Sequence, residues 1–212
     1  MKLYYYLFLF IPLLLFASCE GDEVDYGLGE YQIELTTCLN SNTLLLDNGK
    51  LLTTDNPLSS QYNDGDRIYL MFSYVNDDIE SVNRKISVHS SSKIPLGKVQ
   101  LMSKEEIDEQ INHPIRLESV WTGSRYLNML FYIEFNSVAH SIGLICDKEA
   151  LEQGNIELYF LHSRNDDAPG APVKSVLSFD LSSELGEPIG EKDITVHINS
   201  SNYGDKTYTF VY

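Results

Sequence analysis

The sequence predicts an all-β protein in which a small barrel is followed by an antiparallel β-sandwich. Apolar and polar residues alternate in many short runs, which is the pattern of half-buried strands. Turn residues separate the runs, and at Asn48-Gly49 they supply the positive backbone angles of a tight hairpin. At 212 residues, the chain is long enough for one large domain or two small ones, and the strands divide it into two.

The first predicted domain covers residues 30–93 and contains four or five short strands. Alternation begins in residues 31–37, and leucine runs on both sides of Asn48-Gly49 form the predicted hairpin. Residues 67–75 place four apolar side chains on one face, and residues 84–88 alternate again. This number of strands is enough for a small closed or partly open barrel.

Residues 94–112 are predicted to form a linker with one short helix near the domain junction. Small and polar residues with a proline mark this boundary. Ser103 is a predicted helix N-cap, because Glu106 follows three residues later, in the spacing of a capping box. Residues 113–212 are predicted to contain seven further strands with turns between them, which favours an antiparallel sandwich.

Residues 1–18 predict an export signal rather than part of the fold. Lys2 precedes an apolar stretch that is too short for a comfortable membrane span, which needs about 20 residues. Small residues then stand directly before Cys19, an arrangement that resembles the lipobox of bacterial lipoproteins. The resemblance implies cleavage before Cys19 and lipidation of its sulfur and amine, which would anchor the protein stably to a membrane. The alternative is an ordinary secretory signal with a coincidental cysteine.

Residues 19–29 predict an acidic tether between the lipid and the folded domain. Residues 20–25 contain four acids and no base, which favours an extended and solvated segment. The cluster also resembles the export tags that carry lipoproteins to the cell surface in some Gram-negative anaerobes. We therefore expect an outer-membrane lipoprotein, and both a cell-surface and a periplasm-facing position stay open.

The charge balance argues against one class of partner. Asp and Glu number 31 against 15 Lys and Arg, a formal charge of −16, and such a surface repels phosphate backbones. We therefore expect no nucleic-acid partner.

Cys38 and Cys146 stand far apart, and neither has a neighbouring histidine or a CxxC partner. Two separate buried thiols are favoured over a disulfide, a zinc site or a nucleophile.

Several motifs together resemble those of the NigD-like lipoproteins. In the first half they are Asp25-Tyr26-Gly27-Leu28, Leu46-Asp47-Asn48-Gly49 and Gly65-Asp66-Arg67-Ile68-Tyr69. In the second half they are Trp121-Thr122-Gly123, Tyr126-Leu127-Asn128, Ala139-His140-Ser141-Ile142, Leu161-His162-Ser163 and Ser178-Phe179-Asp180-Leu181. The resemblance implies an N-terminal OB-like barrel and a C-terminal β-sandwich. The family's name comes from an association with bacteriocin production, so a bacteriocin-associated accessory role is one alternative.

The five histidines show no HxH or HExxH spacing. His140 and His162 each share a strand face with apolar residues, and two interpretations remain. The pair could bind a metal together with Asp166 or Asp167, or each could be a buried, hydrogen-bonded histidine at a strand end. The second interpretation is favoured, so we predict no metal site and no cofactor.

Acidic turns offer oxygen ligands of the kind that calcium prefers, at residues 64–66, 76–78 and 165–167. None has the EF-hand spacing, and Asx side chains in such turns often bond the local backbone without any ion. The sequence also contains no GxSxG, P-loop or GxGxxG motif. We therefore predict no catalytic residue.

Weak candidates for ligand binding lie on the polar face predicted for the barrel. This face is expected to carry Arg67, Tyr69, Lys85 and His89, together with Gln32, Glu34 and Ser73. OB-like barrels use such faces for oligosaccharides or oligonucleotides. The alternative is a solvated face on which Glu34 pairs across strands with Arg67 or Lys85.

These features predict a membrane-anchored envelope lipoprotein that acts as a non-enzymatic binding or interaction module. The expected partners are the membrane, through the lipid on Cys19, and a glycan or a protein. The alternative class is a metal-dependent or carboxylate-based hydrolase, which would need converging carboxylates or a metal in a cleft.

Overall fold

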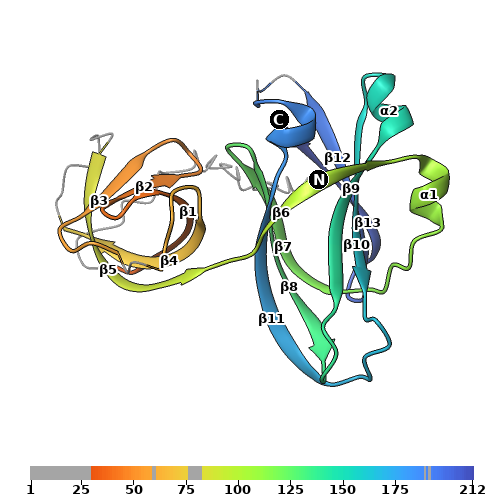
Figure 1. The fold of residues 1–212 in the computed structure, drawn as a ribbon, viewed down its shortest axis with the longest axis horizontal. Helices are drawn as coiled ribbons and strands as arrows, with labels where there is room; N and C mark the ends of the chain where they lie inside the picture. The colour runs from red at the N-terminus through yellow and green to blue at the C-terminus, as the bar shows by residue number, and fades with distance from the viewer. Residues whose placement is uncertain (1–29, 59–60, 76–82, 189, 191) are drawn as a thin grey trace, which may run out of the picture.

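The computed structural model describes residues 30–58, 61–75, 83–188, 190 and 192–212. The predicted signal, Cys19 and the tether lie outside these residues. The chain forms a barrel with its first strands and a larger sandwich beside it with the rest (Figure 1). Among the described residues, no helix is long and apolar enough to cross a membrane.

The N-terminal domain is a closed five-stranded barrel, as the sequence predicts. Its strands are β1 (Gln32–Asn40), β2 (Thr43–Leu46), β3 (Leu51–Thr54), β4 (Arg67–Tyr74) and β5 (Asn83–Lys93). They are hydrogen-bonded in the order β1-β2-β3-β5-β4, and β1 closes the barrel by pairing with both β2 and β4. Strands β3 and β5 run parallel, and the other pairs are antiparallel. A five-stranded barrel of this kind is the OB fold.

The barrel core confirms the predicted apolar face of β4. Ile68, Leu70 and Phe72 are completely buried inside the barrel. They pack with Leu44 and Leu52, which face each other across the β2–β3 hairpin. Gly49 closes this hairpin with a φ of +84°, a conformation that side-chain-bearing residues adopt only with strain. The Asn48-Gly49 turn therefore sets the β2–β3 register that aligns these leucines.

The C-terminal domain contains eight strands in one continuous hydrogen-bonded sheet. They are β6 (Leu96–Met102), β7 (Arg116–Gly123), β8 (Tyr126–Phe135), β9 (Ser141–Asp147), β10 (Ile156–Ser163), β11 (Ala171–Asp180), β12 (Asp193–Ser200) and β13 (Gly204–Val211). Their order is β13-β12-β10-β9-β6-β11-β8-β7. The sheet folds over to give two layers with a core between them. In this core, the ring centres of Phe131 on β8 and Phe160 on β10 lie 5.5 Å apart. This is the predicted sandwich.

Strand β6 connects the two layers, which corrects the predicted boundary. Residues 96–98 pair with β11 in one layer, and residues 99–102 pair with β9 in the other. Part of the predicted linker, residues 94–112, is therefore a strand of the sandwich. This strand is not evident from the sequence, because Val99 is the only β6 residue that is buried and the strand therefore shows weak alternation. Both β6 pairings and the β10–β12 pairing are parallel, so the sandwich is mixed rather than wholly antiparallel.

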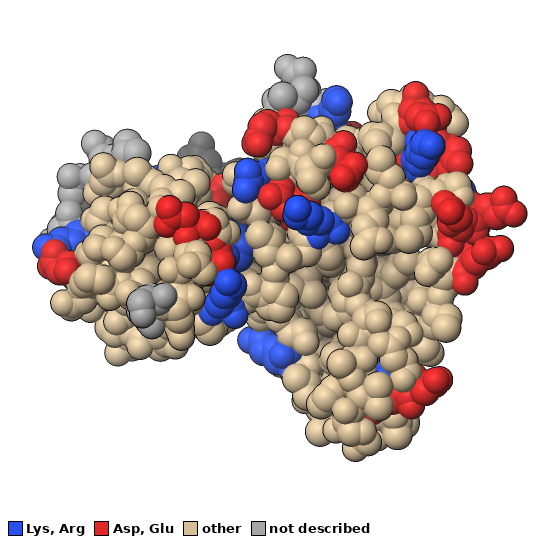
Figure 2. Space-filling view, in the orientation of Figure 1, with Lys and Arg blue, Asp and Glu red and all other residues tan. Residues whose placement is uncertain are grey.

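Three short helices complete the fold, α1 (Lys104–Asp108), α2 (Lys148–Glu152) and α3 (Ser182–Leu185). The predicted capping box is present, because the Ser103 side chain accepts from the backbone of Glu106 and the Glu106 carboxylate accepts from the backbone of Ser103. Acidic side chains gather over α1 and α2, at the end of the sandwich away from the barrel (Figure 2).

Candidate functional site

Arg67, a predicted ligand-binding residue, is completely buried where the barrel meets the sandwich. Its two terminal nitrogens lie 2.7 and 2.8 Å from the two carboxylate oxygens of Asp47, which follows β2. The sandwich adds Asn128 Oδ1 at 3.1 Å and Ser178 Oγ at 3.3 Å, and Thr37 Oγ1 on the neighbouring strand β1 accepts at 3.0 Å. These bonds use all five N–H donors of the guanidinium. We call this set the interdomain arginine network.

The sandwich residues around the network are shaped to receive it. The Tyr126 ring lies 4.1 Å from the guanidinium, in the geometry of a cation–π contact. Gly123, at the end of β7, faces Asp47 so closely that a Cβ atom there would lie 2.5 Å from the Asp47 side chain. The expectation that Arg67 belongs to an open polar face is therefore wrong, and so is the alternative in which it pairs with Glu34 across strands. The sequence indicates only that Asp47 belongs to a turn and Asn128 to a strand. Their contacts with Arg67 are not predictable from it, because a contact between residues 20 or 61 positions apart leaves no periodic signal.

Tyr69, Lys85 and His89 lie on the outer side of the barrel, as predicted. Tyr69 is half-buried, and Lys85 forms an ion pair of 2.7 Å with Asp55 rather than with Glu34. His89 is an extra residue in β5, because Phe72 pairs with Val88 and Met71 with Ser90. Such a bulge re-aims the side chain that it carries. Whether these three residues bind a ligand stays a prediction.

The outer side of β1 differs from the prediction. Gln32 and Glu34 pair directly with Phe72 and Leu70, whose side chains point into the barrel, so these two polar residues share the inward side. Tyr31 and Ile33 therefore point outward, with 67% and 53% of their surface exposed. Gln32 is buried, whereas Glu34 stays exposed to solvent. Arg84 is a further polar residue on the inward side, and its guanidinium lies 3.2 Å from the centre of the Tyr74 ring.

An exposed, partly aromatic surface results on the barrel. The Tyr31 and His89 rings meet edge to face at 4.7 Å, and His89 Nε2 lies 2.9 Å from Ser73 Oγ. Ile33 and its partner Met71 continue the surface along β1 and β4. We call the surface formed by Tyr31, Ile33, Met71, Ser73 and His89 the Tyr31–His89 face.

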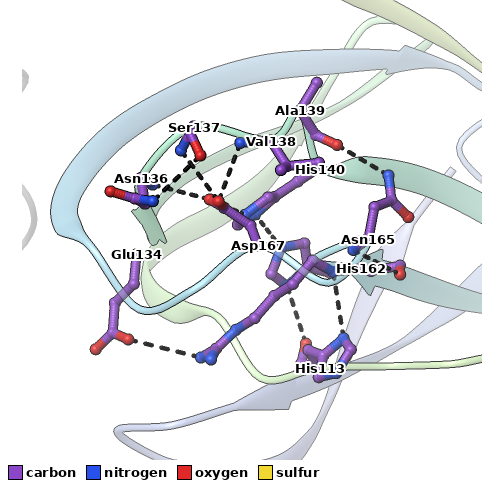
Figure 3. Close-up of polar contacts among 12 residues, drawn as sticks. His113, Glu134, Asn136, Ser137, Val138, Ala139, His140, His162, Asn165 and Asp167 are labelled. Carbon is purple, nitrogen blue, oxygen red and sulfur yellow. Dashed lines mark hydrogen bonds and ion pairs between the residues drawn. The ribbon is translucent and has the colours of Figure 1, made fainter.

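A second polar cluster lies in the sandwich, where the chain enters β9 and leaves β10 (Figure 3). His140 Nδ1 lies 2.9 Å from His162 Nε2, and His140 Nε2 lies 3.3 Å from Asp167 Oδ2. His162 Nδ1 in turn lies 3.1 Å from the carbonyl oxygen of His113. His162 is 1% exposed and the His140 side chain 2%. We call these four residues the histidine cluster.

Asp167 holds two loops together at the edge of this cluster. Its carboxylate accepts hydrogen bonds from the backbone N–H groups of Asn136, Ser137 and Val138 at 2.8 to 3.0 Å. The bond from Asn136 has the largest effect on the pKa of Asp167. Together with the other two backbone bonds and the His140 ring, it keeps this pKa well below its usual range. Asn165 and Asp166 approach through positive φ angles of 50° and 64°, which short Asx side chains tolerate best. The acidic turn at 165–167 is thus a loop clamp.

The His113 carbonyl determines the role of each nitrogen of His162. His162 Nδ1 must carry a proton to bond this carbonyl, so in the neutral ring Nε2 accepts from His140 Nδ1. Burial lowers the pKa of His162, which favours this neutral form.

Every ring nitrogen of His140 and His162 thus has a partner within the protein. Within the described ranges, no group of three or more His, Cys, Asp or Glu residues could hold a metal ion. The acidic turn at Asp66 likewise bonds its own backbone, at Asn63 N, and pairs with Lys93. The turn at 76–78 lies outside the described residues.

The two thiols lie in different domains and are both buried, Cys38 in β1 and Cys146 in β9. Burial raises the pKa of Cys146 to about 11 and raises that of Cys38 as well. At neutral pH both are therefore neutral thiols rather than thiolate nucleophiles.

The fold is that of a two-domain β protein in which an OB barrel is fixed against a sandwich by a buried arginine. Residues 98–212, more than half of the chain, match the family model of the NigD-like C-terminal beta sandwich domain. The chain therefore belongs to the NigD-like family, as its motifs predict. No curated protein matches it.

Solved structures share the whole two-domain fold. A protein of unknown function from Bacteroides vulgatus matches with a TM-score of 0.68 and 22% identity, over 86% of this chain and 91% of that chain. A candidate lipoprotein from Bacteroides fragilis matches with a TM-score of 0.59 and 14% identity, over 86% and 96%. A NigD-like immunity protein from Bacteroides caccae matches with a TM-score of 0.56 and 17% identity, over 86% and 96%. At these identities the likeness shows the fold.

Proposed function

We propose that the protein is an outer-membrane lipoprotein, anchored through Cys19, that acts as a non-enzymatic binding module. Its binding surface is the Tyr31–His89 face of the barrel. The observation that carries this proposal is the exposure of Tyr31 and Ile33 side by side on the first strand, at 67% and 53%. A folded protein that exposes adjacent large apolar side chains on a sheet commonly uses them for recognition.

The chemistry of the face fits a neutral glycan. The Tyr31 ring offers an apolar surface for a sugar ring, and Ile33 and Met71 extend it. The exposed His89 adds an imidazole that can bond sugar hydroxyls, and the buried Ser73 hydroxyl lies 2.9 Å from its Nε2. No Asp, Glu, Lys or Arg belongs to the face, so a charged ligand finds no permanent ion-pair partner on it.

Binding to the face is tested with a glycan array followed by titration calorimetry of the glycans that bind. Tyr31→Ala should weaken binding by about tenfold or more, because it removes the exposed ring. Tyr203→Ala is the matched control, since Tyr203 is 54% exposed but lies on the sandwich. Binding that survives Tyr31→Ala, or an array on which no glycan binds, would overturn the glycan proposal. A protein captured from the cell envelope only when Tyr31 is present would move the assignment to a protein partner.

The anchor and the side of the membrane are tested in cells. Metabolic labelling with a fatty acid should mark the wild type and not Cys19→Ser. Protease added to intact cells should digest the chain if it faces outward. Complete protection until the outer membrane is broken would place it on the periplasmic side.

A second candidate function is an accessory role in bacteriocin biology. The observation that favours it is the shared fold of the Bacteroides caccae protein, which is described as a NigD-like immunity protein. Expression of this chain in a bacteriocin-sensitive strain tests the role directly. Survival above that of the empty vector supports it, and equal killing at matched expression removes it.

A further inference from the structure

A cavity opens in the sandwich at the corner where β6 passes from one layer to the other. Its volume is about 520 Å³, which is within the usual range for ligand pockets. Leu96, Ile142 and Phe179 form apolar walls, and Lys174 and Val176 of β11 line one side. We call this cavity the β11 slot.

The slot runs along a strand edge that carries no partner strand. On one side, β8 pairs with all of β11, from Ala171 to Asp180. On the other side, β6 pairs only with residues 178–180 of β11. In the part of the chain that the structure describes, no other strand covers residues 171–177 on that side. Such an open edge is a template for pairing with another chain.

Alternation along β11 shows which backbone groups face the slot. The N–H of Ser178 points toward β6, because it donates to the carbonyl oxygen of Pro95 at 3.1 Å. Residues two and four positions earlier have the same orientation, so the N–H and C=O groups of Val176 and Lys174 point into the slot. Pro172 lies two residues before Lys174, so its nitrogen also faces the open side of β11. A proline is tolerated within a ladder only where its missing N–H would not face a paired strand.

The walls of the slot select the chemistry of an occupant. Leu96 keeps 42% of its surface exposed at the rim, which leaves apolar area for a side chain of a bound segment. Lys174 is exposed, and none of the residues that line the slot is acidic, although the chain as a whole carries a charge of −16. The slot is therefore a local site for an acidic group on a molecule that otherwise repels acids.

We propose that the β11 slot binds an extended peptide segment of a partner protein, which adds a strand to β11. Backbone groups of the segment pair with Lys174 and Val176, an apolar side chain enters the cavity beside Leu96 and Phe179, and a carboxylate pairs with Lys174. This is peptide recognition by strand addition, in which main-chain bonds give affinity and pockets give specificity. The slot is on the sandwich, so the proposal is independent of the glycan face on the barrel.

A displayed library of random octapeptides, selected on the wild-type protein, supplies the probes. The selected peptides are resynthesised and titrated against three variants. Val176→Pro removes the N–H that faces the slot and leaves the β8 ladder intact, so it should weaken binding by about tenfold or more. Val176→Thr keeps that N–H and should stay within about threefold of wild type. Lys174→Glu should weaken acidic peptides by about tenfold, and Lys206→Glu on β13 should not.

The result that would overturn the proposal is equally specific. Either the selection enriches no peptide, or the enriched peptides bind Val176→Pro and Lys174→Glu as tightly as wild type. If Val176→Pro fails to fold, as judged by its near-ultraviolet circular dichroism, the Lys174→Glu comparison decides, because Lys174 is exposed and its charge can be reversed without loss of the fold.

Discussion

The molecule contains two buried polar clusters that do different structural work. The interdomain arginine network joins two domains through a group that is charged at every physiological pH. The histidine cluster joins two loops within one domain through imidazole rings, and burial lowers the pKa of one of them, His162. Both bury charge inside complete hydrogen-bond sets, as buried charges require. The difference is that the junction between the domains depends on a guanidinium and its acceptors, whereas the loop clamp contains a buried imidazole, His162, whose pKa is lowered.

The largest expected effect is the loss of the arginine network. Arg67→Ala leaves the Asp47 carboxylate, whose side chain is only 17% exposed, without its cation, so the free energy of unfolding should fall by about 3–5 kcal/mol. Urea denaturation measures the change. Arg116→Ala is the control, because Arg116 is exposed and its ion pair with Glu118 is long, at 3.9 Å. A loss below about 1 kcal/mol would mean that the network contributes no more than a surface ion pair.

The second effect concerns the histidine cluster. His162→Leu leaves the His113 carbonyl and the His140 Nδ1 proton without a partner, so stability should fall by about 2 kcal/mol. Thermal unfolding followed by circular dichroism gives the change. His197→Leu, at a partly exposed histidine on β12, should cost less. Equal losses at the two positions would mean that the cluster contributes no more to the free energy of unfolding than a partly exposed histidine does.

The third effect separates the clusters by pH. Burial lowers the pKa of His162 in the fold, so its contribution is present above the unfolded value of about 6.5 and is lost as pH falls through the folded value. The pKa of Asp167 is also lowered, so its contribution is present above about 3.9 and is lost at lower pH. Urea midpoints between pH 8 and pH 5 should fall for wild type and less for His162→Leu. Parallel curves for the two proteins would assign the pH dependence to other groups.

The smallest effect is a single neutral contact within the arginine network. Ser178→Ala removes one acceptor from Arg67 and one donor to Asn128, and should cost about 1 kcal/mol. Ser119→Ala, at an exposed serine on β7, should be close to neutral. Chemical denaturation resolves the pair. A cost for Ser178→Ala as large as that of Arg67→Ala would show that the hydroxyl, and not the charge, controls docking.

The motifs that identify the family converge on these two clusters. Asp47, Arg67, Asn128 and Ser178 come from four separate motifs and meet at the domain junction. Two other motifs supply His140 and His162. The motifs were therefore informative about structure, although sequence reasoning assigned Arg67 to an open face. That assignment failed because alternation tells which residues share a face of a strand and does not tell whether another domain covers that face.

Other features were predictable to different degrees. The β2–β3 hairpin follows from Asn48-Gly49, and the first helix from the capping box at Ser103, because both signals are local. Strand β6 was missed because only one of its residues is buried. The outward position of Tyr31 and Ile33 was missed because a one-residue difference in register exchanges the two faces of a strand.

The sequence by itself determined the all-β class, the two-domain division, the family and the acidity, because these depend on composition, period and local turn chemistry. It also placed His140 and His162 among buried residues and left their partners open. Only the tertiary structure decided that Arg67 faces the sandwich, that the histidines bond each other and Asp167, and that β11 keeps an open edge beside a cavity. Each depends on contacts between residues far apart in the chain, and the free energy of such contacts leaves no periodic mark in the sequence.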